Sequence, residues 1–207
     1  MSLCFDIGAN VGETVQWFLN ENYTKVIAVE PGSGAFSQLF NKFHNDSRVI
    51  MHYIALSSQP GPIEFWDCSF SGTSTAHKEW MTESRFAGKF QWFPCTKNAI
   101  TLDGLIKLHG QPDFIKIDVE SYELEVFKGL TKHIPCDIGF EWAEEEYNQL
   151  NKTVEYLKNL GYSQFSFTYD DHLSDIKNLI YMEWEKLDLH LDIIPSRKEK
   201  WGMVYVR

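Results

Sequence analysis

The 207-residue chain carries 29 acidic and 19 basic side chains, and its net charge of −10 disfavours a nucleic-acid substrate because each phosphate contact needs a Lys or Arg. Its length suffices for one hydrophobic core and no linker-like stretch divides it, so we expect a single domain over residues 1–207. No run of about 18 apolar residues occurs, and residues 1–6 lack the basic and apolar regions of a signal peptide, so we expect a cytoplasmic protein without a membrane partner.

Short apolar runs alternate with segments of helical periodicity along most of the chain. The runs predict strands at residues 3–7, 25–29, 49–55, 113–119, 137–142, 162–168 and 203–206. The intervening segments predict helices, with Ser33 and Thr101 as N-caps and Gly161 ending one helix in a left-handed conformation. This alternation is typical of an α/β fold with a doubly wound, mostly parallel, Rossmann-like sheet and helices on both faces.

The regular pattern weakens between residues 59 and 94. A short strand at 63–66 precedes a polar stretch at 69–75 that is rich in Ser, Thr and Gly. We interpret this segment as an irregular insertion that forms a lid or part of a substrate pocket.

The first predicted strand runs into a glycine turn at the start of a helix. Gly8 and Gly12 carry no Cβ and let the backbone approach a ligand closely. Position 10 is Asn10 rather than glycine, which departs from the pattern of nicotinamide- and flavin-binding turns. Asp6 would repel a pyrophosphate but suits a ligand with ammonium and sulfonium charges. S-adenosylmethionine has both charges and no phosphate.

A second carboxylate ends the second predicted strand, where Val29 is followed by Glu30 and Pro31. A carboxylate at this point of a Rossmann-like sheet accepts hydrogen bonds from both ribose hydroxyls of a nucleotide cofactor. The alternative is structural, with Asp6 and Glu30 as ordinary strand-end carboxylates and glycines that only shape a turn. The spacing of all these features together favours the cofactor site.

These residues carry a family likeness: the chain resembles the FkbM-type methyltransferases, a branch of the class I S-adenosylmethionine-dependent enzymes. The matching segments are residues 5–12, 29–31, 55–57, 101–103, 113–120 and 160–162. The resemblance implies O-methylation of a sugar or secondary metabolite. Where the family usually has Gly-Ala, this chain has Ser121 and Tyr122, so we expect a bulky phenol near the methyl-transfer site.

The resemblance also implies roles for the motif residues. Four residues of the first turn would hold the methionine end of the cofactor: Asp6, Gly8, Asn10 and Gly12. Glu30, next to Pro31, would bind the ribose. The adenine would lie near Ala55 and Leu56.

Three carboxylates are candidates for catalysis: Asp118, Glu120 and Glu141. Asp118 and Glu120 are two apart on a predicted strand and so point the same way, while Glu141 ends the neighbouring strand. A hydroxyl acceptor needs a base within hydrogen-bonding reach. The same group could hold a divalent cation, but we favour a metal-free site because no His or Asn is clearly placed to complete a metal shell. Lys116, of the same strand parity, is expected to pair with a carboxylate.

The predicted function is methyl transfer from S-adenosylmethionine to a hydroxyl group of a small molecule or glycan. Two alternatives stay open at this point. One is a methyltransferase-like module that binds a small molecule without turnover, and the other is a nicotinamide-dependent oxidoreductase. The sequence does not indicate the oligomeric state.

Overall fold

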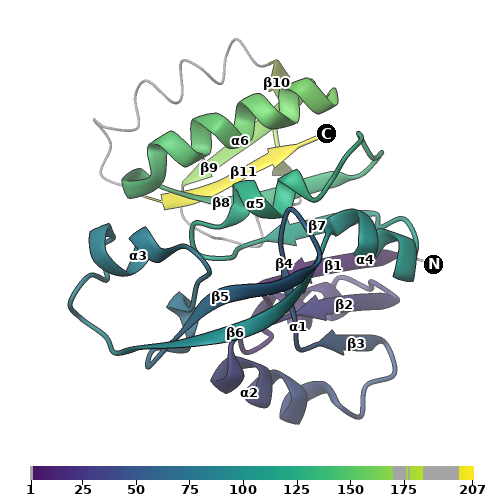
Figure 1. Cartoon of the computed structure of the whole chain (residues 1–207). Helices are drawn as coiled ribbons and strands as arrows, with labels where there is room; N and C mark the ends of the chain where they lie inside the picture. Colours follow the sequence, from purple (N-terminus) through teal and green to yellow (C-terminus); the bar gives the residue numbers. More distant parts are fainter. Residues whose placement is uncertain (1, 170–175, 177, 184–200) are drawn as a thin grey trace.

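The computed structural model describes residues 2–169, 176, 178–183 and 201–207. Its main sheet has eight strands in the order β10-β9-β11-β8-β7-β1-β2-β3 (Figure 1). The strands of this sheet are β1 (Leu3–Ile7), β2 (Lys25–Val29), β3 (Val49–His52), β7 (Phe114–Ile117), β8 (Asp137–Ala143), β9 (Gln164–Tyr169), β10 (Met182–Glu183) and β11 (Trp201–Val206).

Five neighbouring strands, from β3 to β8, run parallel, and β11 inserts antiparallel between β8 and β9. The chain builds outward from β1 to β3 and later returns to place β7 on the other side of β1. The strand order therefore reverses between β1 and β7, and ligands of such sheets bind outside the carboxyl ends of the strands at this point.

Helices cover both faces of the main sheet, which confirms the predicted doubly wound α/β fold. They are α1 (Glu13–Asn20), α2 (Ser33–Phe43), α4 (Leu102–His109), α5 (Glu123–Lys128) and α6 (Tyr147–Leu160). Successive residues of β2 point to opposite faces: Ile27 packs in one core cluster with residues of α4, α5 and α6, and Val26 packs in the other with residues of α1 and α2. Both faces of a parallel sheet are normally buried in this way.

A second sheet occupies the region predicted to be irregular. It contains β4 (Ala55–Leu56), β6 (Trp92–Ile100) and β5 (Gly61–Cys68), in that order, with β5 and β6 paired as a long antiparallel hairpin. Short helices, η1 (Ser71–Thr73) and α3 (Lys78–Glu83), lie in the connection between the two strands (Figure 1). The predicted strand at 63–66 lies within β5, but the sequence did not predict the full length of the hairpin, because the hairpin exposes many of its side chains and lacks a strong hydrophobic pattern.

The predicted strand at 49–55 is also two elements. The main-sheet part ends at His52, and Ala55 and Leu56 pair with β6 of the second sheet. A largely apolar segment does not reveal such a change of partner, because residue type does not show which strand provides the hydrogen bonds.

Helix boundaries match the sequence in two of three cases. Thr101 caps α4 through a side-chain oxygen that accepts from the Gly104 N–H at 3.0 Å, and Gly161 ends α6 with a φ of 104°. Ser33, however, is the first residue of α2 and not its N-cap. The backbone N–H of Ser33 donates instead to Asp67, a residue of β5. Among the described helices, none is both long and apolar enough to cross a membrane.

Candidate active site

A cavity opens at the carboxyl ends of β1, β2 and β7, at the point where the strand order reverses. Eight of the eleven predicted site residues line it: Gly8, Asn10, Glu30, Pro31, Ala55, Leu56, Asp118 and Glu120. The other three do not: Asp6 is fully buried in β1, Gly12 packs against α2, and Glu141 lines a neighbouring cavity. The second sheet and its connection provide further walls through Phe65, Ser71, Gly72, Ser74 and Ala76.

The two glycines of the first turn are required by packing. Gly8 has a φ of 83°, and a Cβ there would lie 1.7 Å from the carbonyl oxygen of Asp118. At Gly12, also at 83°, a Cβ would lie 2.5 Å from the Phe43 ring and 2.7 Å from Leu39. The sequence-based reason, close approach of a ligand, therefore misses the main constraint, which is close approach of the protein to itself.

Glu30 is held rigidly at the floor of the cavity. Its Oε2 accepts a hydrogen bond from the Asn10 N–H at 2.8 Å, and its Oε1 accepts one from the Gly32 N–H at 2.6 Å. Each carboxylate oxygen keeps a second lone pair for another donor. Burial raises the pKa of Glu30 to about 7, although these two backbone hydrogen bonds act in the opposite direction.

Asn10 provides a polar group that has no partner among the described residues. It adopts a left-handed conformation with a φ of 45°, which asparagine tolerates better than most residues. Its Oδ1 is buried without a hydrogen-bond partner among the described residues. Because Asn10 also lines the cavity, this oxygen is available to a donor on a bound ligand.

The opposite wall of the cavity is apolar and is formed by Leu56, Ala55 and Phe65. Tyr122 lies on this side, with its hydroxyl 3.1 Å from the hydroxyl of Ser57. Tyr122 lines the same cavity as Asp118 and Glu120, so the expectation of a phenol near the methyl-transfer site stays a prediction.

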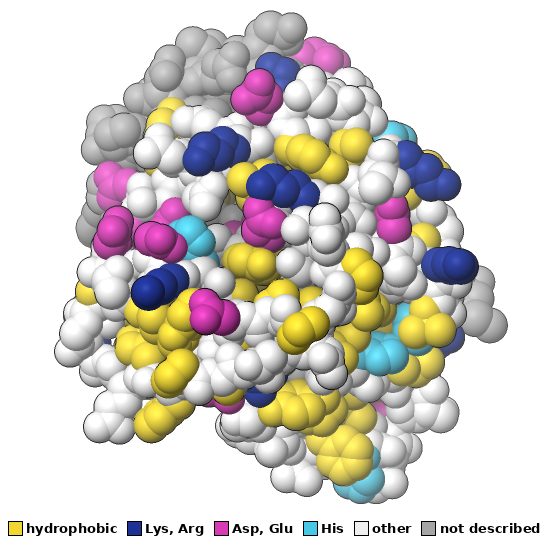
Figure 2. Space-filling model, viewed as in Figure 1, with side chains coloured by type: hydrophobic (Ala, Val, Ile, Leu, Met, Phe, Trp, Pro, Cys, Tyr) yellow, Lys and Arg dark blue, Asp and Glu magenta, His cyan; other side chains and the backbone are white. Residues whose placement is uncertain are grey.

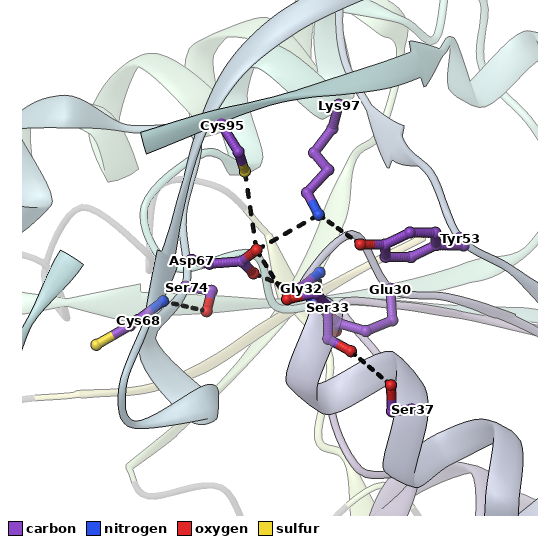
Figure 3. Close-up of polar contacts among 10 residues, drawn as sticks. All are labelled: Glu30, Gly32, Ser33, Ser37, Tyr53, Asp67, Cys68, Ser74, Cys95 and Lys97. Carbon is purple, nitrogen blue, oxygen red and sulfur yellow. Dashed lines mark hydrogen bonds and ion pairs between the residues drawn. The ribbon is translucent and has the colours of Figure 1, made fainter. Parts of the chain in front are cut away.

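A polar network attaches the second sheet to the start of α2 (Figure 3). Asp67 of β5 accepts hydrogen bonds from the backbone N–H of Ser33 at 2.9 Å and from its hydroxyl at 3.0 Å. Lys97 of β6 lies 3.5 Å from the same carboxylate and donates to the Tyr53 hydroxyl at 2.7 Å. The network holds the second sheet next to the Glu30–Gly32 end of the cavity. Sequence reasoning missed it because its members come from distant segments.

The three candidate catalytic carboxylates converge, with ligand atoms of Asp118, Glu120 and Glu141 all within 4.8 Å of one another. The expected reason was incorrect, however. β7 ends at Ile117, and Glu120 points toward the group from a loop, with a φ of 55°. The alternation of side chains along a strand therefore does not explain the position of Glu120.

Electrostatics within this group are unfavourable to several negative charges. Lys116 pairs with Asp118 at 2.7 Å, as the sequence predicts. Burial, together with the charge of Asp118, raises the pKa of Glu120 and of Glu141 well above the usual range. A carboxyl group with a raised pKa is a stronger base when it is ionised, which suits proton removal near neutral pH.

The histidines show one pairing that the sequence did not suggest. His52 and His109 lie with their Nε2 atoms 2.7 Å apart, although 57 positions separate them. Burial lowers the pKa of both rings. The pair lies at the edge of the main sheet and lines neither of the cavities described here.

The switch-point cavity, the acidic residue after β2 and the glycine turn together define an α/β protein with a nucleotide-cofactor site. The model of the FkbM methyltransferase domain matches residues 6–163, about three quarters of the chain. The chain belongs to this family, which confirms the resemblance seen in the sequence and supports S-adenosylmethionine as the cofactor. A search of curated protein sequences finds no match.

Similar solved structures include three methyltransferases. A precorrin-6y C5,15-methyltransferase from Geobacter metallireducens is 10% identical, with a TM-score of 0.49, covering 100% of this chain and 79% of that one. An rRNA methylase from Streptococcus thermophilus is 9% identical, with a TM-score of 0.48 and coverages of 100% and 86%. Fibrillarin from Aeropyrum pernix, with natively bound S-adenosyl-L-methionine, is 8% identical, with a TM-score of 0.49 and coverages of 100% and 66%. Identities this low do not say what this chain binds or methylates.

Proposed function

We propose that this protein transfers the methyl group of S-adenosylmethionine to a hydroxyl oxygen of a small molecule or glycan. The observation that carries the proposal is the position of Glu30, a buried carboxylate held by two backbone N–H groups on the floor of a cavity. Glu30 and the candidate catalytic carboxylates Asp118 and Glu120 line the same cavity. Membership of the methyltransferase family supports the same activity.

The residues of the cavity fit the parts of this cofactor. Glu30 would accept hydrogen bonds from both ribose hydroxyls, and Ala55 and Leu56 would contact the adenine. Asn10 would offer its unpaired Oδ1 to the polar methionine end. Asp6, fully buried beneath the turn, would contribute charge and not direct contact. The bound cofactor supplies an electrophilic methyl group with a leaving group that departs neutral.

The protein then has two tasks. One is to align the acceptor oxygen with the methyl group, because positioning supplies roughly 7–11 kcal/mol in such reactions. The other is to remove the hydroxyl proton. Glu120 or Asp118 would accept it, and burial, with the charges of Asp118 and Glu123, raises the pKa and so the basicity of Glu120. Lys116 would hold the Asp118 carboxylate in position through their 2.7 Å ion pair.

Charge and cysteine chemistry support a small acceptor and a reducing compartment. The net charge of −10 opposes binding of a nucleic acid. All four cysteines are free, namely Cys4, Cys68, Cys95 and Cys136, which supports a cytoplasmic location.

The proposal is tested by incubating the protein with S-adenosylmethionine and a panel of sugars, glycosides and hydroxylated metabolites, and measuring S-adenosylhomocysteine release. Release that depends on one acceptor and adds a methyl group to its oxygen supports the proposal. Tight binding of S-adenosylhomocysteine without turnover on any acceptor would favour a non-catalytic binding module. Binding of NAD in place of S-adenosylhomocysteine would favour an oxidoreductase.

A further inference from the structure

A second cavity lies beside the first, on the other side of the carboxylate group. Asp118 and Glu120 line the first cavity, whereas Ser121 and Glu141 line the second. The carboxylate oxygens of Glu120 and Glu141 approach within 4.8 Å, so about one carboxyl group separates the two spaces. The second cavity encloses about 20 Å³, which is room for a group of the size of one water molecule.

The walls of the second cavity carry oxygen atoms that nothing in the described part of the chain satisfies. The Oγ of Ser121 is buried and has no hydrogen-bond partner, and Ser121 as a whole is only 8% exposed. The Oε1 of Gln149, at the start of α6, is also buried without a partner. Glu141 adds a carboxylate to the same lining. One donor on this wall, the Nε1 of Trp80, is also buried without a partner among the described residues. Buried polar groups normally have partners, and the oxygens of Ser121, Gln149 and Glu141 outnumber this donor and favour a ligand that donates hydrogen bonds.

The nearby cations are already engaged elsewhere. Lys116 pairs with Asp118 at 2.7 Å, and Arg85 lies 3.1 Å from Glu145. His77 lies 3.5 Å from Glu146, which lines the second cavity. On the face of the molecule in Figure 2, acidic side chains gather next to a histidine beside a broad group of hydrophobic side chains. The charge of Lys116 lowers the pKa of Glu141, but burial and the charges of Asp118, Glu120 and Glu123 outweigh it, so this group of carboxylates favours a further positively charged group.

Aromatic residues make up much of the remaining wall: Trp80, Phe140 and Trp142. All three are at most 3% exposed. Aromatic faces attract organic cations and provide no ligand atoms for a metal ion. A primary ammonium group fits better than a hydrated divalent cation, because it needs only three acceptors and the space of one water molecule.

We propose that the second cavity binds a primary ammonium group of the methyl acceptor, with Glu141, Ser121 and Gln149 as its hydrogen-bond acceptors. This inference rests on the proposed function. The acceptor is then an amino alcohol or amino sugar whose hydroxyl lies a few bonds away, at Glu120 and the methyl group. The ammonium nitrogen is the recognition group and is not methylated, since a protonated amine has no lone pair to attack with.

The test uses two probes of equal size, ethanolamine and ethylene glycol, which differ by an ammonium in place of a hydroxyl. Each is titrated into the full chain with and without S-adenosylhomocysteine, and binding is followed by ligand-observed NMR. We expect ethanolamine to bind saturably, at least about tenfold more tightly than ethylene glycol. Glu141→Gln should remove about tenfold of the ethanolamine affinity. Glu64→Gln, an exposed change on β5, should not alter it.

Three results would overturn the inference: equal affinity for both probes, no saturable ethanolamine binding, or no effect of Glu141→Gln. If that variant does not fold, Gln149→Leu removes an acceptor without changing charge and should weaken ethanolamine severalfold. Mg²⁺ that binds and displaces ethanolamine would make the cavity a metal site and also overturn the inference. Failure of S-adenosylhomocysteine to bind contradicts the proposed function, whereas failure of ethanolamine alone contradicts only this inference.

Discussion

Replacing Glu30 by alanine should weaken binding of S-adenosylhomocysteine roughly ten- to hundredfold. The carboxylate would lose two hydrogen bonds to the ribose hydroxyls, and a bond to a charged group contributes about 1.5–3 kcal/mol. The same two oxygens already accept hydrogen bonds from two backbone N–H groups, at 2.6 and 2.8 Å. We therefore expect the total loss of binding free energy to stay near the contribution of one such bond. About 1.4–2.8 kcal/mol corresponds to the stated range of affinity.

Titration calorimetry at about pH 8, where Glu30 is ionised, measures this difference directly, since its pKa is about 7. An S-adenosylhomocysteine analogue without the two ribose hydroxyls is the matched control. It should bind the wild-type protein weakly and should lose little further affinity in Glu30→Ala. Unchanged affinity of the variant for the parent ligand, or equal losses for both ligands, would refute the placement of the ribose at Glu30.

Three further predictions concern turnover, pH and packing. Glu120→Gln or Asp118→Asn should lower turnover by roughly 10²–10⁴ with little change in cofactor affinity, and full activity in both variants would rule out a carboxylate base. The pKa of Glu30 in the folded protein, about 7, exceeds its reference value of 4.5. The protonated Glu30 side chain therefore contributes fully to the free energy of unfolding below pH 4.5, and this contribution is lost as the pH rises through 7. The melting temperature of the ligand-free protein should thus fall over this range, and by less in Glu30→Gln; parallel pH profiles would contradict the assignment. Gly8→Ala should destabilise the fold by several kcal/mol, because the new Cβ would collide with the Asp118 carbonyl. Gly34→Ala is the control, since no atom lies within 4 Å of its Cβ position. Equal melting temperatures of the two variants would disprove the packing argument.

The centre of the fold was predictable because its residues are buried on both faces. The strands β1 and β2 have the predicted bounds, Leu3–Ile7 and Lys25–Val29, since continuous apolar runs between polar turns have few other interpretations. The second sheet was not predictable in the same way. Its strands expose many side chains, and hydrophobic patterning is therefore weak in the segment that forms the hairpin.

The candidate site was partly predictable for a related reason. Motif residues on short turns, such as Gly8, Asn10 and Glu30, keep fixed positions relative to their strands, and all three line the cavity. Contacts between distant segments leave no spacing signal. Asp67 reaches Ser33 from 34 positions away, so neither local periodicity nor a short motif could reveal it.

The most direct test of the central claim is a crystal structure with S-adenosylhomocysteine bound. We predict that the ribose hydroxyls contact the Glu30 carboxylate, that the adenine lies against Leu56, and that the sulfur faces Asp118 and Glu120. A ligand bound outside this cavity, or one whose ribose does not approach Glu30, would contradict the account.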